Sequence, residues 1–292
     1  MSYLKIVTLN CGLLDLNIMG LNIFSNPPYS NKRIKYIPNE LIKSNGDIIA
    51  LQECFNINYA KFIINKVQKI YKYSSMFNTE TLTQFSNGLI ILSKYPITEA
   101  KFKEYNLTNP IERIFSTKGY LTCTIDIPNI GLINFINVHT TSIGDPPEEN
   151  NNILTPNKLV LFNQLEEILS KVTIKTIILG DFNCSNNNST NNYNFLISNN
   201  LIDVLDIFNK YTDLNLCTWK PNTLLTQNGP HSHYPSSCID HIMINKYLFN
   251  FCKITNCKII FDDNIVHIND NMYSTISDHF GIYVELKFSN NT

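Results

Sequence analysis

Short runs of apolar and β-branched residues, separated by turn-forming residues, recur along the chain. Such a run between turn signals is typical of a strand buried in a sheet. We predict strands at residues 3–9, 47–52, 88–93, 121–127, 132–139, 174–179, 238–244, 252–261 and 281–288. The fourth and fifth of these flank the turn sequence PNIG, which predicts a β-hairpin.

Helical periodicity lies between some of these strands. Thr155 and Pro156 provide an N-cap and a first helical residue for the sequence NKLVLFNQLEEILSKV. Its apolar face is predicted to contain Leu159, Phe162, Leu165 and Leu169. Residues 32–44 and 57–70 show weaker helical patterns of the same kind. Strands mixed with helices in this way predict a four-layer α/β sandwich, in which helices flank two packed mixed sheets.

Three segments are predicted to be loops. Residues 186–194 are rich in asparagine, residues 13–30 are unusually apolar, and residues 212–237 are long and contain Trp219. Long ordered loops in a compact domain are commonly functional. No shift in composition divides the chain, so residues 1–292 are predicted to form a single catalytic domain.

Composition narrows the range of functions. The net charge is −1 and the pI is about 6.6, so no global positive field attracts nucleic acid. The eight cysteines contain no CxxC pair, which predicts reduced, largely buried thiols. The sequence contains neither a signal-peptide pattern nor a long apolar run. We expect a cytoplasmic monomer without a transmembrane segment.

Polar side chains occur where six of the predicted strands begin or end. They are Asn10, Glu53, His139, the pair Asp181 and Asn183, Asp240, and the pair Asp278 and His279. Any one of them alone fits an ordinary turn. Their recurrence indicates a shared crevice at one sheet edge. Asp240 lies inside the apolar run CIDHIMI and needs a partner there, whereas His241 points to the opposite face and is predicted to be structural.

The residue types suit a particular chemistry. Hard oxygen ligands without thiolates favour Mg²⁺, with Mn²⁺ as a substitute. Two histidines with carboxylate partners can transfer protons or stabilise charge on a phosphoryl group. The sequence has no GxSxG or GxxxxGK[ST] motif. His231 and His233 could also bind a metal, although no third ligand is near them in the sequence.

The ordered motifs TLNCG, LQEC, NVHTTS, ILGDFNC, CIDHIMI and SDHFGI resemble the endonuclease/exonuclease/phosphatase superfamily, which has the DNase I-like fold. The stretches SNGLIILSKYPI and STKGYLTCTI are most similar to its neutral sphingomyelinase branch. This resemblance implies a Mg²⁺-dependent phosphodiesterase that cleaves a phospholipid head group at a membrane surface by in-line attack of water. The run HTTS matches that branch only partly.

The resemblance also implies a role for each residue. Glu53 would be the main metal ligand, with Asn10 close to the metal or phosphate and Asp278 near a possible second metal. Asp181 would orient or deprotonate water, and Asn183 would hold the phosphate. His279, oriented by Asp240, would be the general base, and His139 would stabilise the phosphorane or assist the leaving group. Lys118 and Trp219 are candidate substrate-binding residues.

Three alternatives remain open at this point. A nuclease would need basic residues beside the crevice, and the sequence offers only scattered ones such as Lys32, Arg33 and Lys118. An inositol polyphosphate phosphatase would share the same polar residues. A catalytically inactive binding module is a third reading, against which the complete polar set argues.

Overall fold

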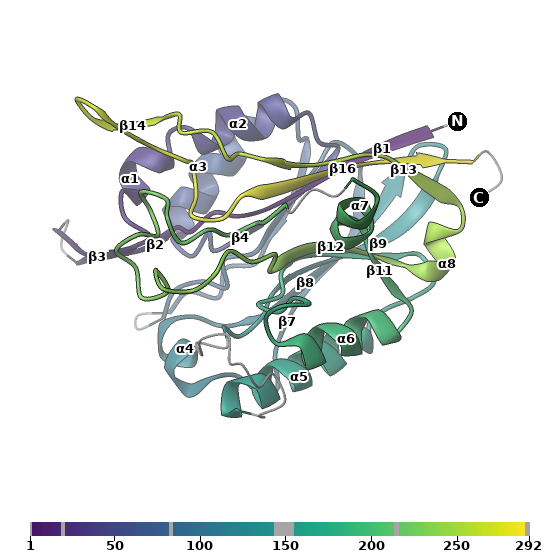
Figure 1. The fold of residues 1–292 in the computed structure, drawn as a ribbon. Helices are drawn as coiled ribbons and strands as arrows, with labels where there is room; N and C mark the ends of the chain where they lie inside the picture. Colours follow the sequence, from purple (N-terminus) through teal and green to yellow (C-terminus); the bar gives the residue numbers. More distant parts are fainter. Residues whose placement is uncertain (1, 19–20, 82–83, 143–154, 213–215, 290–292) are drawn as a thin grey trace.

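The computed structural model describes residues 2–18, 21–81, 84–142, 155–212 and 216–289 (Figure 1). Two six-stranded mixed sheets form its centre. The first has the order β13 (Cys252–Ile260), β16 (Gly281–Phe288), β1 (Ser2–Asn10), β4 (Ile48–Gln52), β6 (Ile90–Ser93) and β5 (Tyr73–Met76). The second has the order β11 (Leu201–Asp203), β12 (Asp240–Asn245), β10 (Thr176–Asp181), β9 (Gly131–His139), β8 (Gly119–Ile127) and β7 (Ile97–Glu104).

Helices cover the outer faces of both sheets (Figure 1). The helices are α1 (Ser30–Arg33), α2 (Ile37–Ser44), α3 (Ile57–Val67), α4 (Pro110–Phe115), α5 (Pro156–Leu169), α6 (Thr190–Ser198), α7 (Val204–Thr212) and α8 (Lys246–Phe249). Helices α2 and α3 pack on the first sheet, and α5 and α6 pack on the second. The predicted four-layer α/β sandwich is therefore confirmed.

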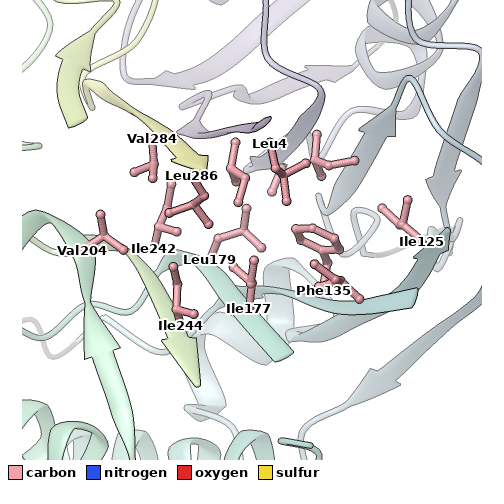
Figure 2. Close-up of a cluster of buried hydrophobic side chains, with 14 of the residues drawn as sticks. Leu4, Ile125, Phe135, Ile177, Leu179, Val204, Ile242, Ile244, Val284 and Leu286 are labelled. Carbon is pink, nitrogen blue, oxygen red and sulfur yellow. The ribbon is translucent and has the colours of Figure 1, made fainter. Parts of the chain in front are cut away.

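The main core lies between the sheets, where side chains such as Leu4, Phe135, Leu179 and Ile242 interlock (Figure 2). Alternate residues of each strand point away from this layer, because successive side chains of a strand face opposite sides of the sheet. Val7 and Leu9 accordingly pack under α2 and α3. This two-sided burial explains why residues 48–51 of β4 and 177–179 of β10 read as uninterrupted apolar runs.

Several predicted segments differ in detail. Residues 13–30 are not a loop, since β2 (Leu14–Ile18) and β3 (Leu21–Asn26) form an antiparallel hairpin. The asparagine-rich segment 186–194 already contains the start of α6. The helix predicted at 32–44 is interrupted, because α1 ends at Arg33 and α2 begins at Ile37, followed by Pro38. A second hairpin, β14 (Val266–Asn269) with β15 (Met272–Ser274), was not predicted.

The N-cap of α5 is where the sequence placed it, with Thr155 Oγ1 accepting from the Lys158 amide at 3.3 Å. The predicted apolar face is correct for Leu165 and in part for Leu169, but not for Leu159. Leu159 is 51% exposed, whereas Leu161, Leu165 and Ile168 are buried. In the described part of the chain, no helix is long and apolar enough to span a membrane.

Candidate active site

The polar strand ends predicted from the sequence meet at one end of the two sheets. In the first sheet Asn10 pairs with Gln52, the residue before Glu53, across the parallel strands β1 and β4. In the second sheet Asp181 lies between His139 on β9 and Asp240 on β12. The carboxyl ends of β1, β4, β9 and β10 therefore lie next to the start of β12, as expected for a ligand site in an α/β fold.

Close packing of the backbone explains the glycine of the GDFN motif. Gly180, at φ +133°, lies so close to β9 that an added Cβ would stand 2.1 Å from the carbonyl oxygen of Val138. Glu53 and Asn183 also have positive φ values, of 55° and 50°. For residues other than glycine this conformation costs about 1–2 kcal/mol. Strained residues at two neighbouring strand ends indicate a site where side-chain direction matters more than local stability.

The partly buried carboxylate of Glu53, the buried carboxylate of Asp181 and the Asn10 amide form the centre of the site. Asn10 Nδ2 donates to Glu53 Oε1 at 2.9 Å and to Asp181 Oδ2 at 3.0 Å. Asn10 Oδ1 accepts from the Gly12 amide at 3.0 Å. His139 Nε2 lies 3.5 Å from Glu53 Oε1 and 3.9 Å from Asp181 Oδ2. Asn10 thus bridges the two carboxylates through its nitrogen, while its oxygen is held by the backbone.

Burial and like charges make both carboxylates weaker acids. Burial, followed by the charge of Asp278, raises the pKa of Glu53 to about 7. Burial, followed by the charge of Asp240, raises the pKa of Asp181 to about 6. A bound cation would therefore favour the ionised form of each of these carboxylates.

A histidine–carboxylate pair forms the wall beside this centre. His279 Nδ1 lies 2.8 Å from Asp240 Oδ2, which leaves Nε2 as the ring atom that can act on a ligand. Burial opposes a charged ring, but the charge and hydrogen bond of Asp240 raise the pKa of His279 well above its usual value. The Asp240 amide donates to Thr218 Oγ1 at 3.2 Å. The buried Asp240 is therefore paired with His279, as the resemblance implied.

A buried lysine contributes positive charge on the opposite side. Lys118 Nζ lies 3.0 Å from His139 Nε2, 3.0 Å from the Thr140 carbonyl oxygen and 3.3 Å from Glu112 Oε1. Burial, followed by the charges of Lys118 and His279, lowers the pKa of His139 well below its usual value. A neutral His139 accepts from Lys118 at Nε2 and carries its proton on Nδ1.

Glu112 was not predicted from the sequence. It lies in a short, mostly exposed helix that ends just before the STKGYLTCTI motif. No local pattern distinguishes it from a solvated surface carboxylate. Its contact with Lys118 becomes visible only once α4 packs beside the ends of β8 and β9.

These groups line a cavity of about 280 Å³. Eight of the predicted residues line it: Glu53, Lys118, His139, Asp181, Asn183, Trp219, Asp278 and His279. Asn10 and Asp240 lie directly behind this wall through their hydrogen bonds. Apolar walls come from side chains that include Phe55, Phe115 and Trp219. Part of the 212–237 segment, including His231 and Tyr234, also reaches the cavity, and the backbone of Trp219 bridges both Ser237 and His279.

The structure does not support a metal site at His231 and His233, and it confirms the prediction of reduced, largely buried cysteines. His231 and His233 each contact the ring of Tyr234 and join neither of the possible metal-binding groups in the described part of the chain. All eight cysteines are free and six are buried. These thiols therefore act as small apolar side chains in the packing.

Arg33 is not a phosphate-binding residue of the crevice. Its guanidinium is fully buried and donates only to backbone carbonyl oxygens, among them those of Cys11 and Ile276 at 3.0 Å each. These bonds tie the segment after β1 to the segment before Asp278. Gly12 is needed in that segment, since an added Cβ would stand 2.4 Å from Asp278 Oδ1.

His241, expected to be structural, has both ring nitrogens bonded. Nδ1 lies 2.8 Å from Asp203 Oδ2, and Nε2 donates to the Cys184 carbonyl oxygen at 2.8 Å. Tyr193 donates to the same carboxylate oxygen at 2.8 Å. Burial opposes both charges, yet the mutual attraction raises the pKa of His241 and lowers that of Asp203. This buried ion pair supports the backbone that follows Asn183.

The His241→Ala variant is expected to lose ~3–5 kcal/mol of unfolding free energy, because it leaves the buried Asp203 without its cation. The folded protein holds the imidazole proton to higher pH than the unfolded chain. The contribution of His241 is therefore complete below pH about 6.5 and is lost as pH rises through its folded pKa. Urea denaturation across this range, with the exposed His267→Ala as control, measures it. Equal stability of the two variants would contradict the ion pair.

The chain belongs to the Endonuclease/Exonuclease/phosphatase family, whose model matches residues 7–279. Over 132 residues it is 29% identical to an inositol phosphosphingolipids phospholipase C of Schizosaccharomyces pombe, covering 44% of this chain and 30% of that protein. The chain thus matches about a third of that relative's length.

Solved structures share the fold across nearly the whole chain. The structure of Staphylococcus aureus beta toxin matches with a TM-score of 0.73 at 19% identity, covering 96% of this chain and 99% of that one. Sphingomyelinase C from Streptomyces griseocarneus matches with a TM-score of 0.70 at 13% identity, covering 98% and 99%. The DNase I-like architecture expected from the motifs is therefore confirmed.

Proposed function

We propose that this protein is a Mg²⁺-dependent phosphodiesterase that hydrolyses the head-group phosphodiester of a sphingophospholipid. The observation that carries the proposal is the convergence of Glu53, Asp181 and the His279–Asp240 pair around one cavity. The matched phospholipase C of S. pombe, which by its name acts on phosphosphingolipids, supports the substrate class.

The residues present fit a small divalent ion. Glu53, His139 and Asp181 each offer a ligand atom within 4.8 Å of the others. Two carboxylates with raised pKa values suit Mg²⁺, which usually takes one or two protein carboxylates and completes its shell with water and phosphate. A structure of S. aureus beta toxin contains bound magnesium ions. When bound, the ion supplies positive charge to the phosphoryl oxygens.

The protein side chains divide the remaining work. His279 Nε2 removes a proton from the attacking water, and Asp240 holds the ring in the orientation that this transfer requires. Asp181 and Asn183 orient the water and the phosphate from the end of β10. Lys118, next to neutral His139, stabilises the charge that develops on the phosphoryl group. Asp278 adds negative charge near Glu53, where a second ion would bind.

The charge of the cavity favours a lipid over nucleic acid. Among the described residues that line it, Lys118 is the one lysine or arginine, beside the carboxylates of Glu53, Glu112, Asp181 and Asp278. A polyanionic strand needs several basic contacts along its backbone. The apolar walls suit the acyl-bearing part of a lipid. A nuclease stays the second candidate, because the fold also matches D. rerio TDP2 complexed with single strand DNA product, at a TM-score of 0.65.

Parallel assays test the proposal. Purified protein with Mg²⁺ is offered sphingomyelin vesicles, inositol phosphosphingolipid vesicles, plasmid DNA and an inositol polyphosphate. We expect release of the phosphorylated head group from a sphingolipid, and loss of that release with EDTA. Cleavage of DNA alone, with a steep dependence on salt, would establish the nuclease instead. Mg²⁺ binding without hydrolysis of any substrate would establish an inactive binding module.

A further inference from the structure

Helix α4 carries its apolar side chains on the outside. Ile111, Ile114 and Phe115 are 67%, 65% and 50% exposed, and the helix has no buried residue. Positions i, i+3 and i+4 lie on one face of a helix, so these three side chains form a single apolar surface. Surface helices usually turn such a face toward the core, as α3 does with Ala60, Ile63 and Val67.

Polar contacts, rather than apolar packing, hold α4 in place. Glu112 Oε2 accepts from Thr141 Oγ1 at 2.8 Å, and Oε1 accepts from the Ser142 amide at 3.1 Å and pairs with Lys118. Asn109 caps the helix by accepting from the Ile111 amide at 2.8 Å. The two isoleucines belong to none of the three apolar clusters of the core. Their apolar character is therefore not explained by the fold.

The apolar surface of α4 is continuous with the mouth of the cavity. Phe115 and Glu112 line the cavity as well as belonging to α4. In Figure 1 the helix lies at the end of the molecule where the β2–β3 hairpin also lies. Contact of this surface with a bilayer would therefore bring lipid head groups to the cavity that contains Lys118 and His139.

We propose that Ile111, Ile114 and Phe115 of α4 dock the cavity mouth onto a phospholipid bilayer, an inference that rests on the proposed action on a lipid. A folded protein partner would need on the order of 800 Å² on this side. One six-residue helix offers far less, whereas insertion of a few apolar side chains is enough for reversible binding to lipid.

The test compares two double variants, each of which replaces two exposed aliphatic side chains with serine. Ile111→Ser/Ile114→Ser removes the outward side chains of α4 that do not line the cavity. Leu132→Ser/Ile174→Ser removes two side chains of similar exposure, 52% and 59%, from the opposite end of the second sheet. Binding is measured by co-sedimentation with vesicles of phosphatidylcholine and phosphatidylserine, which contain no sphingolipid. Turnover of soluble bis(p-nitrophenyl) phosphate is measured in parallel.

We expect the α4 variant to bind vesicles at least about tenfold more weakly than the wild type, since each buried isoleucine contributes strongly to transfer from water. The control variant should bind as the wild type does, and both should keep wild-type turnover of the soluble diester. A wild-type protein that does not sediment with vesicles, or an α4 variant that binds equally well, would overturn the docking surface. Vesicle binding lost in the α4 variant alone supports docking even where no sphingolipid is cleaved, an outcome that rejects only the proposed substrate.

Discussion

The His279→Ala variant is expected to hydrolyse a phosphodiester ~10²–10⁴-fold more slowly than the wild type. His279 is the one cavity-lining histidine whose ring is held by a carboxylate, Asp240, at 2.8 Å. Without it, no other described side chain is placed to exchange a proton at that wall. Single-turnover measurements with a soluble diester, at saturating Mg²⁺, separate this loss from any change in lipid binding.

The substitution is expected to lower stability, because it leaves the buried Asp240 without its cation, as His241→Ala leaves Asp203. Turnover is therefore compared only under conditions where the variant is folded. His267→Ala, an exposed histidine on β14, serves as the control for loss of an imidazole. Normal turnover by a folded His279→Ala protein would remove His279 from the mechanism.

The Asp240→Asn variant distinguishes a base from a merely structural ring. Asp240 favours the protonated form of His279, and its replacement should lower the pKa of that imidazole. A general base must be neutral to act. The acidic limb of the kcat/KM profile should therefore move to lower pH in the variant, while a histidine that only supports the wall would leave the limb in place.

Strand identity was predictable wherever both faces of a strand are buried. The runs at residues 48–51 of β4 and 177–179 of β10 are apolar throughout, whereas β1 also contains Lys5 and Thr8. The polar endings of all three follow from the point where the sheet stops. Their convergence was also predictable, because parallel strands present their carboxyl ends on the same edge. The order of the motifs along the chain was thus enough to assemble the cavity.

Other features depend on packing that a local pattern does not record. Apolar and polar residues alternate only weakly in β7, which lies at the edge of its sheet. The buried face of α5 depends on where the second sheet lies. Arg33 reads as a surface residue beside Lys32, yet it is buried because backbone carbonyls from segments far apart in the sequence surround it. Such contacts join residues more than 200 positions apart, which no window of sequence captures.

Mg²⁺ is expected to reverse the order of stability of the wild type and the Glu53→Gln variant. Glutamine keeps the size of the side chain and can still accept from Asn10 Nδ2, but it removes one of the crowded negative charges. Burial and Asp278 raise the pKa of Glu53 to about 7, above its usual range, so the ionised carboxylate is less favourable in the folded protein than in the unfolded chain. This penalty is absent below pH about 4.5, grows up to pH about 7 and is complete above it.

At pH 8 without Mg²⁺ the variant should therefore melt at a higher temperature than the wild type. With Mg²⁺ the order should change, because a ligand that binds only the folded state adds about 2.7 kcal/mol when its concentration is 100 times Kd. The wild type gains this stabilisation and the variant loses most of it, together with turnover. Thermal melts with and without Mg²⁺ measure the difference in Tm between the two proteins in each condition. The exposed Glu99→Gln on β7 is the matched control. An equal upward shift of Tm by Mg²⁺ in both proteins would place the ion elsewhere, because a carboxylate that ligates it cannot be replaced by an amide without loss of affinity.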